Sequence, residues 1–146
     1  MTSAEYVTLT IDGQLFGVPV LSIQDVFKPR GLTAVPKATS EIAGLLNLRG
    51  RVVTAIDARA RLGLAPRDPE AKPMAIGIEQ GGEPFCLIVD EVGEVLRLDP
   101  SEIQANPPTL DSRWASVSLG VHRLEGRLLV IMDINRMLSA EIASAA

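Results

Sequence analysis

One segment occurs twice in this chain, and this internal duplication limits the folds that the sequence can adopt. Residues 48–57 read LRGRVVTAID, and residues 124–133 read LEGRLLVIMD. Each copy contains a Gly-Arg corner, an apolar run of strand length, an aspartate and a short apolar-patterned tail. These tails end at Leu62 and Leu138. The sequence therefore predicts that one supersecondary unit is present twice.

The two copies differ in charge at one corner position, where Arg49 is replaced by Glu125. Agreement between copies is explained by a shared scaffold, whereas a difference in chemistry is a candidate for function. An arginine in a turn is ordinarily an exposed surface residue. The functional interpretation is an arginine held by a carboxylate at the wall of a docking groove, with Asp25 as the best-placed partner.

A β-hairpin is predicted ahead of each copy, because apolar runs of strand length flank a two-residue turn. In the second hairpin Phe85 falls where Phe16 falls in the first, so the duplication covers more than one strand pair. The predicted strands are residues 6–11 and 15–20 around Asp12-Gly13, and residues 74–79 and 85–89 around Gly81-Gly82.

Short helices are predicted after each copy, each with an aspartate as its N-cap. Residues 65–73 are rich in proline and charge, which predicts an exposed connector at the approximate midpoint of the chain. The predicted helices are residues 58–62 after Asp57 and a terminal helix after Asp133, with Ile134, Met137, Leu138 and Ile142 on one side. A further single helical turn is predicted ahead of the first copy, at residues 41–43, with Thr39 or Ser40 as its cap.

The composition favours an aliphatic, β-rich core. Hydrophobic residues make up 47% of the 146 residues and aromatic residues 3%, so Val, Ile, Leu and Ala must fill the interior. Many short strands with little helix indicate small closed or nearly closed barrels rather than a crossover α/β sheet. We therefore expect an all-β fold with two barrel-like lobes.

Charge and hydropathy exclude two classes of partner. The net charge of −4, from 14 basic and 18 acidic residues, leaves no basic stripe for nucleic acid. The apolar runs are far shorter than the ~20 residues that cross a bilayer, and Glu5 stands where a secretory peptide is apolar. We expect a cytoplasmic protein without direct membrane insertion, and its one cysteine, Cys86, to be buried.

Motifs of catalysis are missing from the sequence. With one histidine (His122) and one cysteine there is no zinc quartet, and no phosphate-binding loop, dinucleotide fingerprint or nucleophile elbow occurs. We therefore expect no cofactor, no metal and no enzymatic activity. His122 is interpreted as a surface or hydrogen-bonded structural residue, and Trp114 as either a packing anchor or an interface residue.

One alternative stays open at this stage. A small-molecule-binding or enzymatic barrel could use Asp25, Asp57 or Asp90 in a cleft between the lobes. Converging acids with displaced pKa values would favour this alternative, and a shallow aliphatic groove would favour docking.

The sequence resembles the CheW family of chemotaxis coupling proteins. The resemblance rests on the run GLLNLRGRVV at residues 44–53, followed by Ile56-Asp57 and RLGL at residues 61–64. It extends over nearly the whole chain, from about residue 6 to residue 138. Further matches are FGV at residues 16–18, VDEV at residues 89–92 and LVIMD at residues 129–133.

The resemblance implies two five-stranded SH3-like β-barrel subdomains packed around a shared core, with short helices and a C-terminal helix. We expect a CheW-like domain at residues 5–140, with residues 141–146 as a tail or helix end. The family implies a non-catalytic adaptor that couples the cytoplasmic hairpin tip of chemoreceptors to the regulatory domain of a CheA-type histidine kinase, in chemotaxis or a related chemosensory pathway. It also implies possible ring assembly with CheW-like domains.

The resemblance also implies a receptor-binding site. Ile23, Gly44 and Arg49 match family positions that engage receptors, and Asn47 belongs to the same Asn-Leu-Arg-Gly element as Arg49. Asp25 takes the place of a usual glutamate, which shortens the acid by one methylene. Two departures lie away from this corner: Thr54 stands where the family often has proline, and Ala58 where it often has leucine.

Overall fold

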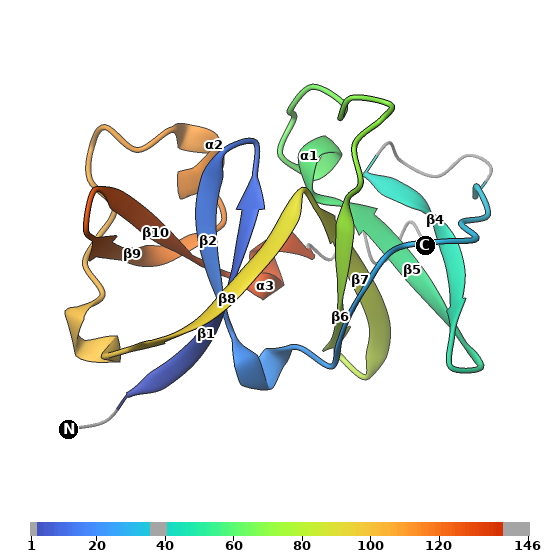
Figure 1. Cartoon of the computed structure of the whole chain (residues 1–146), viewed down its shortest axis with the longest axis horizontal. Helices are drawn as coiled ribbons and strands as arrows, with labels where there is room; N and C mark the ends of the chain where they lie inside the picture. The colour runs from blue at the N-terminus through green and yellow to red at the C-terminus, as the bar shows by residue number, and fades with distance from the viewer. Residues whose placement is uncertain (1–2, 36–40, 139–146) are drawn as a thin grey trace.

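The computed structural model describes residues 3–35 and 41–138 and consists mainly of two five-stranded sheets that lie side by side (Figure 1). We call the sheet β8-β1-β2-β10-β9 barrel A and the sheet β3-β6-β7-β5-β4 barrel B. The predicted all-β class is confirmed. The strands are β1 (Ala4–Ile11), β2 (Gln14–Pro19), β3 (Asp25–Phe27), β4 (Ile42–Leu48), β5 (Arg51–Asp57), β6 (Met74–Gln80), β7 (Glu83–Val89), β8 (Glu91–Leu98), β9 (Ser118–Leu124) and β10 (Arg127–Met132).

The helices are single turns. Their bounds are α1 (Ala58–Arg61), α2 (Ser112–Ala115) and α3 (Ile134–Met137), with 3-10 turns η1 (Val20–Ser22) and η2 (Pro100–Glu102). The predicted caps are confirmed, because Asp57 accepts a hydrogen bond from the Arg59 amide and Asp133 accepts one from the Arg136 amide.

One predicted helix is wrong. Residues 42 and 43 belong to strand β4, in which Ile42 pairs with Ile56 of β5, so pairing with a neighbouring strand outweighs the local helix signal. The predicted caps Thr39 and Ser40, together with Ile142 and the tail at residues 141–146, lie outside the described residues.

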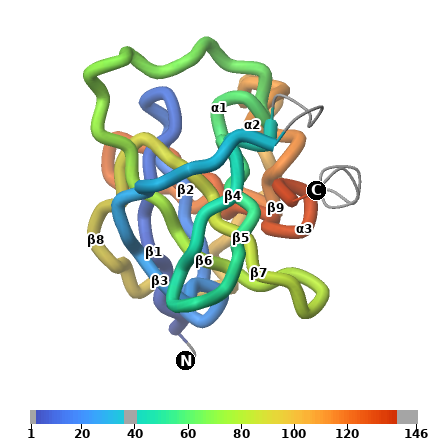
Figure 2. Tube along the Cα trace, turned by 90° about the vertical axis from the view of Figure 1, so that its right-hand side faces the viewer, coloured from blue at the N-terminus to red at the C-terminus, as the bar shows by residue number. Residues whose placement is uncertain are grey.

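The two copies of the repeat exchange strands between the barrels. Barrel A contains the first hairpin of the first copy, β1-β2, with β8, β9 and β10 of the second copy. Barrel B contains β6-β7 of the second copy with β3, β4 and β5 of the first. The connector at residues 65–73 (green, top of Figure 2) joins α1 to β6, which are both on the side of barrel B. The two barrels are therefore not the two halves of the chain.

The same contact closes both barrels. After β3, Thr33 forms a two-way backbone bridge with Leu45 of β4, and after β8, Gln104 bridges Val121 of β9. Beside these bridges Gly44 and Gly120 have φ angles of +152° and +142°, and a Cβ at either would come within 2.7 Å of the bridging residue's carbonyl oxygen. Glycine at both positions therefore allows the chain to cross close to the strand.

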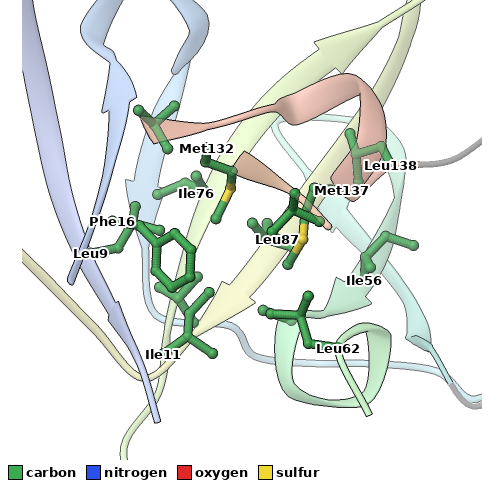
Figure 3. Packing of buried hydrophobic residues seen from close by; sticks show 14 of the residues in the cluster. Leu9, Ile11, Phe16, Ile56, Leu62, Ile76, Leu87, Met132, Met137 and Leu138 are labelled. Atoms are coloured by element: carbon green, nitrogen blue, oxygen red, sulfur yellow. The ribbon is translucent and has the colours of Figure 1, made fainter. Parts of the chain in front are cut away.

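Within the described part of the chain, buried side chains form three groups. One lies inside each barrel, and the largest lies between the barrels, where side chains from both sheets and from the helices meet (Figure 3). Strands that face both a barrel interior and this shared core are apolar on both sides, which explains continuous apolar runs such as Phe85 to Val89. Cys86 is buried inside barrel B as predicted, and burial raises the pKa of its thiol to about 12. Trp114 is a packing anchor whose ring meets Phe16 edge-on, with centroids 5.5 Å apart.

A cluster of ion pairs also joins the barrels. Asp90, where the chain passes from β7 of barrel B to β8 of barrel A, accepts hydrogen bonds from Arg59 Nη2 and Arg67 Nε at 2.7 Å each. It also accepts one at 2.7 Å from the amide of Asp12, in the β1–β2 turn of barrel A. Arg67 Nη1 reaches Asp57 at 2.8 Å, so the connector is attached to the same cluster. The Asp90 side chain is 16% exposed.

Burial by itself raises the pKa of the Asp90 carboxyl. The hydrogen bond from Arg59, the Asp12 amide and the charges of Arg67 and Arg59 together outweigh burial, so the pKa lies below its ordinary value. Asp90 is therefore ionised in the folded protein, and its charge is matched on several sides.

We predict that Asp90→Asn lowers the free energy of unfolding by about 3 kcal/mol at neutral pH, because Arg59 and Arg67 both lose a largely buried carboxylate and Arg67 is left with Asp57. Urea unfolding followed by circular dichroism measures the change. Asp68→Asn removes the same charge from an exposed turn of the connector and should change stability by less than about 0.5 kcal/mol. Equal losses in the two variants would contradict a specific role for Asp90.

The same contact should depend on pH. Because the folded pKa of Asp90 lies below the value of about 3.9 for an unfolded aspartate, its stabilisation is present above that value and is lost as pH falls through the folded pKa. The difference in unfolding free energy between wild type and Asp90→Asn should therefore shrink from pH 6 to about pH 3. A difference that is constant or grows on acidification would contradict this assignment.

Candidate functional site

One end of barrel B is open and holds a pocket of about 250 Å³. Each strand contributes one residue at its rim: Asp25 from β3, Gly77 from β6, Pro84 from β7, Arg51 from β5 and Leu48 from β4. Each of these lies two residues along its strand from a side chain in the interior of barrel B, so all five face inward. We call this the mouth pocket. Its remaining lining residues are Gln24, Arg49, Val53, Ile78 and Phe85.

The predicted pairing of Asp25 with Arg49 is present. Arg49 Nη2 lies 2.6 Å from Asp25 Oδ1, and the two side chains are 76% and 18% exposed. The shorter acid therefore still reaches the guanidinium, because the β4–β5 hairpin places its turn beside β3 (Figure 2). Strong exposure limits the stability that this pair supplies. What the pair does is hold the arginine head in a defined place at the rim.

Arg49 occupies an unusual backbone conformation. Leu48 pairs with Arg51, so Arg49 and Gly50 form a two-residue hairpin loop, with φ angles of +54° and +81°. This is the pattern of a type I′ turn, in which asparagine or glycine is normally preferred at the first position. Asn47 supports the loop, since its Oδ1 accepts the Gly50 amide at 3.0 Å. An arginine there strains the backbone, which is typical of functional sites.

The duplicate turn in barrel A is built differently. Gly126 has a φ of +74°, but Glu125 is not in the left-handed region. The two copies therefore differ in both charge and turn geometry at the position of Arg49.

Gly77 keeps the mouth pocket open. A Cβ at this position would lie 3.3 Å from Asp25 Cβ, so a side chain would press on the acid. The corresponding position in barrel A is Thr8. In the first hairpin Thr8 pairs with the residue after Phe16, and in the second hairpin Gly77 pairs with the residue after Phe85. Thr8 is buried, and its hydroxyl donates to the Glu94 carbonyl at 2.7 Å. The space left by Gly77 therefore distinguishes barrel B from barrel A.

A second hollow of about 340 Å³ lies between the barrels and is partly aliphatic. Its most prominent apolar side chains are Leu21, which is 99% exposed, and Leu119, which is 62% exposed. Gln24 lines both hollows and donates to Glu79 at 2.8 Å, so the two surfaces adjoin. We call the second hollow the inter-barrel groove. It is lined by Pro19, Leu21, Ser22, Gln24, Glu79, Gln80, Leu119, Met132, Asp133, Ile134 and Asn135.

The structure brings together some of the predicted site residues and separates others. Asp25 and Arg49 meet at the mouth pocket, and Asn47 lies in the turn that carries Arg49. Ile23 is half-buried and packs against the shared core between the barrels. Gly44 is buried under Thr33, where its position serves the closure of barrel B.

Sequence reasoning missed Leu21, Leu119 and Gly77. Leu119 lies between buried residues of β9 and Leu21 between half-buried apolar residues, so pattern alone gives no sign that these two side chains are exposed. Gly77 carries no side chain, but its alignment with Thr8 in the repeat was a usable signal.

The acids of the alternative interpretation do not converge. Asp25 lies at the mouth of barrel B, where β5 begins, whereas Asp57 lies at the other end of β5 and is bound with Asp90 by Arg67. The lowered pKa of Asp90 keeps it ionised, which does not suit a proton donor near neutral pH. Within residues 3–35 and 41–138, no group of three or more His, Cys, Asp or Glu side chains could hold a metal ion.

His122 differs from its interpretation as a surface or hydrogen-bonded residue. It pairs with Leu129 across the β9–β10 ladder, so its ring faces the apolar interior of barrel A and is buried. Nε2 lies 3.5 Å from Glu102 Oε2, and in the described part of the chain neither ring nitrogen makes a hydrogen bond.

Comparisons with known proteins agree with one another. The sequence model of the CheW-like domain matches residues 5–141. The chain is 26% identical to the chemotaxis protein CheW of Rhizobium meliloti (strain 1021), over 97% of this chain and 92% of that protein. It is 28% identical to the chemotaxis protein CheW of Bacillus subtilis (strain 168), over 99% of this chain and 93% of that protein.

None of the helices in the described residues has the length and apolar character needed to span a membrane.

The fold is similar to a solved structure. The crystal structure of the scaffolding protein TtCheW from Thermoanaerobacter tengcongensis superposes with a TM-score of 0.84 at 24% identity, covering 97% of this chain and 92% of that one. The arrangement of two five-stranded sheets is therefore shared with that protein.

We predict that Arg49→Asn raises the free energy of unfolding by about 0.5 kcal/mol, because asparagine tolerates the left-handed conformation and the lost ion pair is exposed. Chemical unfolding measures the change. Glu125→Asn is the matched control, since Glu125 carries no such strain, and it should be neutral. A loss of more than about 1 kcal/mol in Arg49→Asn would show that the ion pair, not the strain, dominates the turn.

Proposed function

The chain belongs to the CheW family, and we propose on this premise that it is a non-catalytic signalling adaptor that couples the cytoplasmic hairpin tips of chemoreceptors to a CheA-type histidine kinase. The pathway is chemotaxis or a related chemosensory pathway. These partners are cytoplasmic domains, so we propose the same compartment for this chain. We further propose that residues 5–140 act as one CheW-like domain.

The observation that carries the proposal is the exposed Arg49 head held by Asp25 beside a partly aliphatic groove. A strained backbone and a carboxylate together hold this arginine in place, although the pair is too exposed to stabilise the fold strongly. Such an arrangement suits recognition of a partner. The pair would define the orientation of a bound helix more than its affinity.

Affinity would come from the inter-barrel groove. Leu21 and Leu119 offer side chains that an apolar receptor helix pair can cover, at roughly 25 cal/mol per Å² of apolar surface buried. Ile23 would act from beneath by supporting this surface, and Gly44 by closing barrel B. We assign the kinase regulatory domain, and any ring assembly with CheW-like domains, to barrel ends other than the mouth pocket.

We predict that Arg49→Ala reduces capture of a soluble chemoreceptor tip fragment by at least about tenfold, because the orienting cation is lost at the rim. Capture of the kinase regulatory domain should stay near the wild-type level. Pull-down of both partners with purified protein measures both effects. The matched control is Glu125→Ala, which truncates the corresponding turn of barrel A and should leave receptor capture unchanged.

Undiminished capture of the receptor fragment by Arg49→Ala would contradict the proposed site. Failure of the wild-type protein to bind either partner would contradict the adaptor function itself. Unfolding measurements on each variant separate loss of binding from loss of folding.

A further inference from the structure

We propose that Arg51 determines the specificity of the mouth pocket, and that the partner segment docked there presents a carboxylate side chain that pairs with it. This inference rests on the proposed docking function and adds the chemistry of the bound group. Glutamate fits best, because its two methylenes can lie on apolar residues while its carboxylate reaches the cation.

The charges that line the mouth pocket do not balance. Its charged lining residues are Asp25, Arg49 and Arg51. Asp25 and Arg49 neutralise each other in their ion pair. Among the described residues no carboxylate oxygen lies within 4.0 Å of the Arg51 guanidinium, and this side chain makes no hydrogen bond. The pocket therefore has one positive charge that no described residue of this chain neutralises.

Docking of a partner on the mouth pocket would remove water from around Arg51. Arg51 stands at the rim, and the next inward-facing residue of β5, Val53, is buried in the interior of barrel B. Pro84 and Phe85 add further apolar surface to the lining. A partner that covers this pocket excludes water from around Arg51. A wholly apolar partner would leave the charge desolvated and unpaired, whereas a carboxylate would form a charge-assisted hydrogen bond.

The second copy of the repeat has an arginine at the position of Arg51, but its surroundings differ. Arg127 occupies the corresponding strand position in barrel A and is also exposed. The adjoining turn carries Glu125, an acid, where the first copy has Arg49. The space that Gly77 leaves in barrel B is occupied in barrel A by buried Thr8. The two arginines therefore share a backbone position, but Arg51 faces an open pocket.

The test compares Arg51→Glu with Arg127→Glu, which change the net charge equally. Isothermal titration calorimetry measures binding of a soluble chemoreceptor tip fragment to each full-length variant, at about 50 mM and about 500 mM salt. We expect Arg51→Glu to weaken binding at least about tenfold at low salt, and Arg127→Glu less than about twofold. The gap should narrow at high salt. Glutamates of the receptor tip fragment are replaced by lysine one at a time, and one of these replacements should restore binding to Arg51→Glu.

Each outcome has one meaning. If Arg51→Glu binds like wild type while Arg49→Ala does not, the inference is overturned and the proposed function stands. If both variants bind like wild type, the inference and the proposed receptor site at Arg49 are overturned, whereas the adaptor function is overturned only if the wild-type protein binds neither partner. Equal losses in Arg51→Glu and Arg127→Glu would indicate an effect of overall charge and would also overturn the inference. Unfolding measurements on each variant verify that binding is compared between folded proteins.

Discussion

The hydrogen-bonded exchange of strands between the two copies of the repeat is the constraint on which the rest of this structure depends. Neither barrel is complete without strands from both copies, so the barrels must form together and face each other across a common interior. Strands that serve a barrel interior on one side and the shared core on the other have no solvent face over much of their length. This accounts for strands that are apolar on both faces, in a core that is mainly aliphatic and contains Tyr6, Phe16, Phe85 and Trp114 as its buried aromatic residues.

The exchange also explains how the candidate site is assembled. After the first hairpin in barrel A, the chain crosses to barrel B and forms β3. Asp25 begins β3 and there meets Arg49 in the β4–β5 turn. Just ahead of β3, η1 carries Leu21 across the junction between the barrels, and this crossing leaves the side chain exposed over the groove. At the candidate site the barrels differ in two residues, because Arg49 stands where barrel A has Glu125 and Gly77 stands where barrel A has Thr8.

Local signals in the sequence predicted much of this molecule. Two-residue turns, aspartate caps and the period-two pattern identified the hairpins and the short helices. The contrast between Arg49 and Glu125 singled out Arg49 as a functional candidate, and its predicted pairing with Asp25 is present in the structure. Strand exchange was not predictable in this way, because either partition of the strands buries the same apolar residues. Residues 41–43 were misassigned for a related reason: a capping signal is local, but pairing with β5 depends on a strand several residues further along.

The topology has a consequence for the origin of the domain. A chain with a single copy of the repeat could complete neither barrel, because its first hairpin and its last three strands would belong to different sheets. Two such chains related by a two-fold axis could complete both barrels, each lending strands to the other. Fusion of the two genes would then free the copies to diverge independently. A symmetric dimer must carry the same residue at both turns, whereas a fused chain can keep an arginine at one and an acid at the other.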